Sequence, residues 1–158
     1  MTAEATPDDP LLLACRHLSR QMDLFDDAAA RALGLGRNDL RALNLLEHGP
    51  LSAATIADRL GLTRAGVTAV IDRLEHGDLV VRTSSPGDRR VVLVELQPAT
   101  WAAFARVYRP LGQQVHEAIA GLPQDERVRV ADALEILAVT FSAAAAGLSA
   151  RSARTPSS

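Results

Sequence analysis

The sequence predicts a mainly α-helical chain that carries one small β-hairpin. Apolar residues recur at three- and four-residue steps over most of the chain, which is the spacing of one face of an α-helix. Between residues 79 and 96 the pattern changes to two valine-rich runs, "LVVRT" and "RRVVLVEL", joined by the polar turn "SSPGD". Such a pair of runs is typical of a hairpin. We therefore expect four helices, a hairpin and two further helices, in that order.

Length and composition fit a single domain with a helical appendage. The chain has 158 residues, of which 47% are hydrophobic, and this is enough to build a core. The N-terminus, "MTAEATPDDP", lacks the basic start and apolar run of a signal peptide, and uninterrupted apolar runs are only a few residues long. We therefore expect a cytoplasmic protein without a membrane segment. The net charge of −2 gives no overall basic signature, although all 17 basic residues are arginine, whose forked donor suits phosphates.

The N-terminal part predicts two helices. The first covers residues 9–33 and ends at Gly34. Its apolar stripe consists of Leu11, Leu12, Cys15, Leu18, Met22 and Phe25. The second helix covers residues 39–48, with Asn38 as its N-cap, and ends before the Gly-Pro pair at 49–50.

Two short helices follow, separated by a turn at Gly61. The first of them covers residues 53–60 after the cap Ser52, and the second covers residues 64–76 after the cap Thr63. A glycine-containing turn this short makes the helices cross steeply, as in a helix-turn-helix unit, so that the second helix projects outward.

The hairpin after this outward helix completes a winged-helix arrangement, which we expect over residues 37–97. Its tip would lie beside the outward helix, where Arg89 and Arg90 can enter the minor groove of double-stranded DNA. Asp88 lies two residues before Arg90, and we expect it to hold that arginine in position through an ion pair. Acidic and basic residues cancel between residues 52 and 96, so the prediction of DNA binding rests on where the arginines point.

Helices return after the hairpin. One covers residues 98–120 and ends at Gly121. Pro123 then opens a helix over residues 124–146, whose first turn carries acidic residues that complement the helix dipole.

The terminal helices predict a dimerisation region, which we place at residues 9–36 and 98–148, with flexible tails at 1–8 and 149–158. The last helix would be about 35 Å long and leaves an apolar stripe that a small winged domain cannot cover. The residues expected at the interface between two copies are Leu11, Leu12, Leu134, Leu137, Phe141 and Leu148. An intramolecular bundle of the same helices is the alternative.

The stretch "GPLSAATIADRLGLTRAGVTAVIDRLEHGDLVVRTSSPGDRRVVLVELQP" resembles the DNA-binding core of MarR-type transcriptional regulators. The resemblance lies in the helix end "IDRLE", the strand start "LV-R" and the "D-R-R" before an alternating strand, and the flanking helices match the family's plan. It implies a homodimer on a palindromic operator, and in many members a small, often aromatic, effector that releases the DNA. It also implies that Thr63–His76 is the recognition helix and that Asp88 and Arg90 are the wing's Asp-x-Arg, with Arg90 in the minor groove. The chain departs from the family at Asp78, where a glycine is usual, with Gly77 one position earlier.

We expect the DNA-binding side chains to come from the helix-turn-helix and the hairpin. They are Ser52, Thr63, Arg64, Ala65, Gly66, Thr68, Arg73, Arg82, Asp88, Arg89 and Arg90. Small residues in the first turn of the outward helix allow close approach, and free N–H groups there can bind phosphate. The alternative is a winged-helix module that binds proteins, although such a module has little need for Arg90.

Other residues carry weaker functional hypotheses. Trp101, Phe104 and Tyr108 recur at helical spacing, which indicates core packing, with a share in an effector pocket as the alternative. Cys15 is interpreted as an apolar core residue, with a thiol-based redox sensor as the alternative. The histidines lack metal-ligand spacing, and no nucleophile–base pair, phosphate loop or carboxylate pair emerges. We therefore expect no metal, no cofactor and no enzymatic activity.

Overall fold

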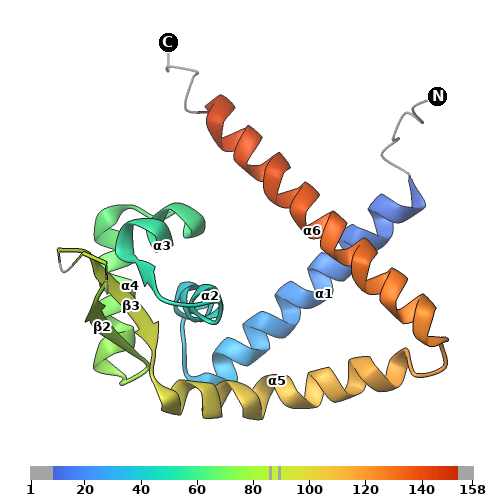
Figure 1. The fold of residues 1–158 in the computed structure, drawn as a ribbon, viewed down its shortest axis with the longest axis horizontal. Coiled ribbons are helices and arrows are strands. Elements are labelled where there is room, and N and C mark those ends of the chain that lie inside the picture. Colours follow the sequence, from blue (N-terminus) through green and yellow to red (C-terminus); the bar gives the residue numbers. More distant parts are fainter. Residues whose placement is uncertain (1–8, 86, 89, 153–158) are drawn as a thin grey trace. The chain divides into compact units, whose positions relative to one another are not determined.

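The computed structural model describes residues 9–85, 87–88 and 90–152, which form helices and one small antiparallel sheet. The elements are α1 (Pro10–Leu33), α2 (Arg37–Leu46), β1 (Leu51–Ser52), α3 (Ala53–Leu60), α4 (Arg64–His76), β2 (Val80–Ser84), β3 (Val92–Leu96), α5 (Pro98–Ala118) and α6 (Gln124–Ser152) (Figure 1). This order confirms the predicted class, a mainly helical chain with a hairpin between its fourth and fifth helices.

The chain forms two compact units, Met1–Arg109 and Pro110–Ser158. The boundary falls within α5 at Pro110, where the helix lacks one N–H donor and the proline ring crowds the preceding turn. The first unit contains the sheet, α1 to α4 and the start of α5. The predicted division into a winged domain and a dimerisation region is a division by function, and it stays a prediction.

The predicted caps of the two short helices are confirmed. The Ser52 hydroxyl accepts a hydrogen bond from the Thr55 N–H at 3.1 Å, and the Thr63 hydroxyl accepts one from the Gly66 N–H at 3.1 Å. Between the two helices, Gly61 has the left-handed conformation, with φ of 67°. The turn therefore forms as predicted, since glycine reaches that conformation without strain.

The start of α2 differs from the prediction. The helix begins at Arg37, and its N-cap is Gly36 rather than Asn38, which lies inside the first turn. The Asp39 carboxylate accepts a hydrogen bond from the Gly36 N–H at 3.1 Å, which is the half of a capping box that a glycine N-cap allows. The helix also ends at Leu46, two residues before the predicted end at His48.

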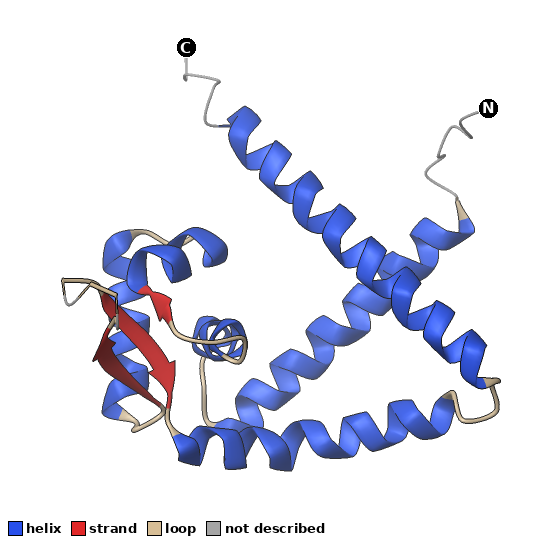
Figure 2. Cartoon of the chain, in the orientation of Figure 1, coloured by secondary structure: helices blue, strands red, loops and turns tan. Residues whose placement is uncertain are grey.

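The sheet has three strands in the order β1-β3-β2 (Figure 2). The predicted hairpin pairs β2 with β3 from Val80↔Leu96 to Ser84↔Val92. The additional strand β1 pairs with the other edge of β3, and its two residues are too few to produce a sequence pattern.

The core of the first unit forms where α4, the sheet and α2 meet. The apolar face of α4 is buried through Val67, Val70, Ile71 and Leu74. Val80 and Val94 of the sheet are equally buried, and burying one such side chain stabilises the fold by about 1.5–3 kcal/mol. The buried Thr100 hydroxyl donates to the Leu79 carbonyl at 2.6 Å and so joins the start of α5 to the strand region.

The last helix, α6, is longer than predicted. It continues to Ser152 and therefore includes residues 149–152, which were expected to be a flexible tail. Large apolar side chains along it are exposed, including Leu134, Ile136 and Phe141. By length and composition alone, the stretch Gln124–Leu148 could cross a membrane, since it contains an 18-residue window with a mean hydropathy of 1.5.

Asp78 has a φ of 55° and is the non-glycine residue with positive φ in the described part of the chain. Replacing Asp78 with glycine should stabilise the protein by about 0.5–1 kcal/mol, because glycine removes the left-handed strain but has a more disordered unfolded state. Urea unfolding measures the change. Gly34→Ala is the matched opposite, since Gly34 has φ of 70° and open space around it, and it should destabilise by about 1 kcal/mol. A urea midpoint for Asp78→Gly at or below that of the wild type would show that Asp78 is not strained.

Candidate nucleic-acid interface

The helix-turn-helix presents one face of α4 to solvent. Its apolar face is buried, as described above, while Arg64, Thr68 and Asp72 follow one another at four-residue steps on the exposed side. Residues four apart lie on one helix face, so these side chains form a polar stripe. The outward helix predicted from the turn spacing is therefore present.

The first turn of α4 keeps hydrogen-bonding capacity at its surface. The Thr63 hydroxyl accepts from Gly66 N–H, so its own proton remains available for donation. The Thr68 hydroxyl donates to the Arg64 carbonyl at 2.9 Å, so its lone pairs remain available. Ala65 is exposed and small, and Gly66 lies against the Thr63 hydroxyl, where an added Cβ would come within 3.3 Å. This turn can approach another surface closely.

The wing holds one arginine in a forked ion pair. Arg90 donates through Nε to Asp88 Oδ1 at 3.1 Å and through Nη2 to Asp88 Oδ2 at 3.2 Å, and its backbone N–H donates to Oδ1 at 2.9 Å. These bonds hold the pKa of the Asp88 carboxyl below its ordinary value, the guanidinium more than the backbone N–H. The Arg90 side chain is nevertheless 91% exposed. The predicted pairing is confirmed, and it leaves the guanidinium accessible.

Arg82 lies between the wing and α4 rather than at the tip. From β2 it donates to Asp72 at 2.6 Å and also to Glu75, both on α4. The structure thus places Arg82 in a network that joins the second strand to the recognition helix, and its predicted contact with DNA remains untested.

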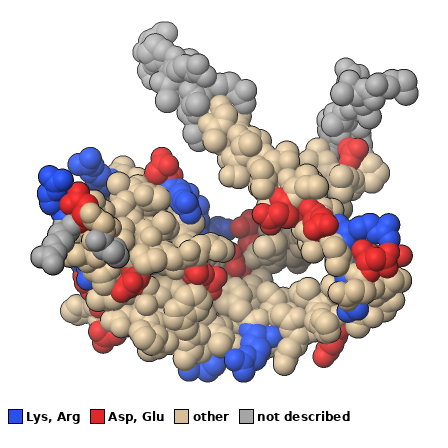
Figure 3. Space-filling model, in the orientation of Figure 1, with Lys and Arg blue, Asp and Glu red and all other residues tan. Residues whose placement is uncertain are grey.

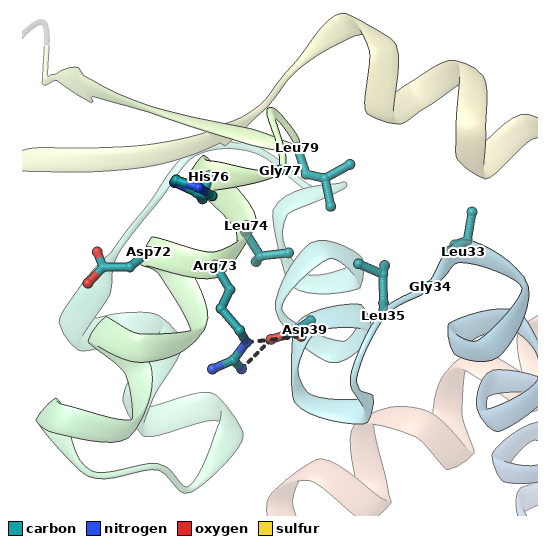
Figure 4. A pocket seen from close by; sticks show the side chains of 10 residues that line it. All are labelled: Leu33, Gly34, Leu35, Asp39, Asp72, Arg73, Leu74, His76, Gly77 and Leu79. Atoms are coloured by element: carbon teal, nitrogen blue, oxygen red, sulfur yellow. Dashed lines mark hydrogen bonds and ion pairs between the residues drawn. The ribbon is translucent and has the colours of Figure 1, made fainter.

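Arg73 reaches in the other direction, toward α2. Its Nη2 donates to Asp39 Oδ1 at 2.6 Å, and its Nε donates to Asp39 Oδ2 at 3.4 Å (Figure 4). The Asp39 side chain is only 9% exposed. A pocket of about 720 Å³ adjoins this ion pair. Residues that line it, as Figure 4 shows, include Leu33, Leu35, Leu74 and Leu79.

Asp39 is the residue of this region that the sequence analysis missed. Its partner Arg73 is 34 residues away, so no local pattern connects them. Only its capping role could be predicted locally, because an acidic residue three positions after Gly36 matches a helix-capping arrangement.

The remaining arginines differ in their pairing. Arg64, at the start of α4, makes no ion pair with any residue in the described ranges. Arg89, which was predicted to bind DNA, lies outside the described residues. Figure 3 shows basic and acidic side chains interspersed on the visible face, in keeping with the balanced local charge.

The three aromatic residues predicted for an effector pocket differ in burial, and their share in such a pocket stays a prediction. Phe104 is buried in the core, and Tyr108 packs against it and against Phe25, with ring centroids 5.6 and 5.5 Å apart. Burial raises the pKa of the Tyr108 hydroxyl. Trp101 is 47% exposed and lines a separate pocket of about 180 Å³ with Glu47 and Glu95. The core-packing interpretation therefore holds for Phe104 and Tyr108 only.

The predicted interface residues of the terminal helices are accessible in the single chain. Leu11, Leu134, Phe141 and Leu148 are exposed, and Leu12 and Leu137 are half-buried. Cys15 is also half-buried rather than a core residue. Among the described residues, no group of three or more histidine, cysteine or acidic side chains is placed to hold a metal ion.

Comparison with known proteins gives consistent matches. The family model described as "MarR family" matches residues 33–91. The "uncharacterized HTH-type transcriptional regulator YcgE" of Bacillus subtilis (strain 168) is 35% identical over 112 residues, which cover 70% of this chain and 73% of YcgE. The HTH-type transcriptional repressor NicR of Pseudomonas putida is 34% identical over 87 residues, 54% of each chain. A solved MarR family protein from Bacillus stearothermophilus shares the fold, with a TM-score of 0.67 at 19% identity over 84% of this chain and 93% of its own.

The Asp88–Arg90 ion pair predicts a specific titration. Because Arg90 stabilises the ionised carboxylate, Arg90→Ala should raise the pKa of Asp88 toward its ordinary value, as measured by carbon-detected NMR. In the wild type the ion pair should persist above the ordinary carboxyl pKa and be lost as the pH falls through the lowered pKa. Arg59→Ala, on α3, is the control and should leave Asp88 unchanged. An equal Asp88 pKa in wild type and Arg90→Ala would show that the pair does not form in solution.

Proposed function

Because the chain belongs to the MarR family of DNA-binding transcriptional regulators, we propose that it is a homodimeric repressor that binds a palindromic operator in double-stranded DNA. The observation that carries this proposal is the pairing of two exposed features on one unit. The first is the open first turn of α4 with Arg64, and the second is the wing with Arg90 held at 91% exposure. The DNA target also makes the cytoplasm the expected location.

The two features suit different parts of the duplex. The first turn of α4 offers Arg64, the Thr63 and Thr68 hydroxyls and small neighbours, which can contact base edges and phosphates in the major groove. Arg90 offers a guanidinium of fixed direction, which fits the narrow and electronegative minor groove. We expect Ser52, Ala65 and Gly66 to bring the backbone close to phosphates, and Arg89 to assist at the wing.

Dimerisation follows from the apolar side chains that a single chain leaves exposed. They lie on α1 and on α6, which belong to separate compact units, and pairing with a second copy would remove them from water. A membrane is the poorer partner for α6, because the acidic residues Asp132 and Glu135 lie within the apolar stretch and charged side chains inside the hydrocarbon are costly. Two copies related by a dyad present two recognition helices to half-sites about one DNA turn apart.

Repression and ligand response rest on narrower support. NicR, which is similar over about half of this chain, is named as a repressor. We propose that a small, possibly aromatic effector controls DNA binding, as the family resemblance implies. Of the three aromatic residues predicted to bind an effector, Trp101 is the exposed one, and we propose that the effector contacts it in the pocket that it lines.

Removing the wing arginine tests DNA recognition. Arg90→Ala should weaken binding to the operator by roughly 1–3 kcal/mol, because the minor-groove guanidinium is lost. Fluorescence anisotropy with a labelled operator, selected by the wild-type chain from random DNA, measures the change. Arg106→Ala on α5 is the control for loss of one positive charge. Unchanged affinity in Arg90→Ala would remove the wing from the interface and favour a protein-binding module.

Charging the apolar side of α6 tests the dimer. Leu134→Asp should shift the protein from dimer to monomer at micromolar concentration, because a carboxylate would be buried without a partner. Sedimentation velocity gives the mass. Ala54→Asp introduces the same charge on an exposed site of α3, outside the proposed dimerisation region, and should leave the dimer intact. A monomeric wild type, or a dimeric Leu134→Asp, would contradict the proposed interface.

A further inference from the structure

We propose that the Asp39–Arg73 ion pair positions the recognition helix for sequence discrimination, and that Arg73 is a positioning residue rather than a DNA contact. This inference rests on the proposed function, since it concerns how α4 is held while it contacts DNA. It reassigns a side chain that the sequence alone predicts to bind DNA.

The direction of the Arg73 side chain is the first argument. Arg73 is nine residues after Arg64, which at about 100° per residue places it roughly on the opposite side of α4. Its guanidinium already donates two hydrogen bonds to Asp39 on α2. The guanidinium is therefore turned toward α2, with 57% of the side chain still exposed, while Arg64 and Thr68 lie on the face offered to DNA.

The second argument is what Asp39 joins. One carboxylate accepts from the Gly36 N–H, at the start of α2, and from Arg73, in the third turn of α4. Because the Asp39 carboxylate is nearly buried, these donors take the place of water, and moving it away from them would leave a buried charge without hydrogen bonds. A change in the direction of the junction between α1 and α2 would thus be transmitted to the recognition helix through one residue.

The third argument is the hollow beside the ion pair. A pocket of about 720 Å³ lies between the end of α1, the start of α2 and the last turns of α4 (Figure 4). This pocket is open to solvent, so on this side of the unit α2 and the last turns of α4 are joined across the surface by the Asp39–Arg73 ion pair. On another side of α4, Asp72 and Glu75 bind Arg82 of the wing. Helix α4 is thus held by ion pairs on two sides, through Arg73 to α2 and through Asp72 and Glu75 to β2.

The test compares Asp39→Asn, Arg73→Gln and the double variant in the full chain. The readout is the ratio of affinities for the DNA that the wild type selects from a random pool and for a scrambled duplex, measured at several salt concentrations. Each single variant should lower this ratio roughly tenfold, since coupled neighbours interact by about one order of magnitude in equilibrium constant. The double variant should lose no more than either single one. Affinity for scrambled DNA and the salt slope should stay at the wild-type values.

A phosphate contact through Arg73 predicts the opposite pattern. Arg73→Gln would then weaken binding to all sequences alike and reduce the salt slope by about 0.9. Asp39→Asn would release the guanidinium and strengthen binding to all sequences. Either result would overturn the inference. If Arg73 is a positioning residue, Asp39→Asn lowers the affinity ratio, whereas if Arg73 contacts phosphate, Asp39→Asn strengthens binding to every sequence.

Two further variants keep the result interpretable. Asp58→Asn, at an exposed position of α3, removes an acidic charge from the same unit and should leave the affinity ratio unchanged. Arg73→Lys retains the charge but not the planar fork, so it should lower the ratio even if Asp39→Asn does not fold. A wild type without preference for any DNA would overturn the proposed function and this inference together. A wild type with a clear preference that Asp39→Asn and Arg73→Lys both retain would overturn the inference alone.

Discussion

Helix α4, which faces outward, is joined to α2 through a nearly buried carboxylate. Asp39 caps α2 at Gly36 and binds Arg73 of α4, so the helix that faces outward is tied to the helix beneath it. The apolar face of α4 fixes its depth in the core, and such packing is non-directional. The hydrogen bonds of α4 with Asp39 on one side and with Arg82 on another are directional, and under our proposal they set the orientation of the exposed first turn.

This arrangement explains how a chain with a net charge of −2 can serve as a DNA reader. Its arginines have separate tasks. Arg73 and Arg82 pair with acidic residues of the same unit, Arg90 pairs with Asp88, and Arg64 makes no ion pair among the described residues. A chain of this kind gains little from non-specific attraction to DNA, so its binding depends on the geometry of its contacts and, under the proposed dimer, on their duplication. The acidic residues of the winged domain are therefore part of the interface's construction, since Asp39, Asp72 and Asp88 each orient an arginine.

The sequence could predict those features whose cause is local. The caps Ser52 and Thr63 directly precede their helices, and Asp88 and Arg90 are two residues apart. The two cap hydrogen bonds and this ion pair can therefore be predicted from residues that are close in the sequence. The Asp39–Arg73 pair joins residues 34 apart, and Arg82 finds Asp72 across ten residues, so these depend on the folded arrangement. The shift of the α2 cap from Asn38 to Gly36 has the same origin, because Asp39 serves the cap and the ion pair together. The separation of Trp101 from Phe104 and Tyr108 likewise became visible only when burial was known.

Mapping the DNA footprint by backbone amide chemical shifts tests the central claim most directly. With the selected operator added, the account predicts the largest shifts at Arg64 to Thr68 in the first turn of α4 and at Asp88 and Arg90 in the wing. The Asp39–Arg73 hydrogen bonds should persist in the complex, with the Arg73 Nε–H resonance still protected from exchange. Shifts confined to α5 and α6, or release of the Arg73 guanidinium from Asp39 on binding, would contradict the account.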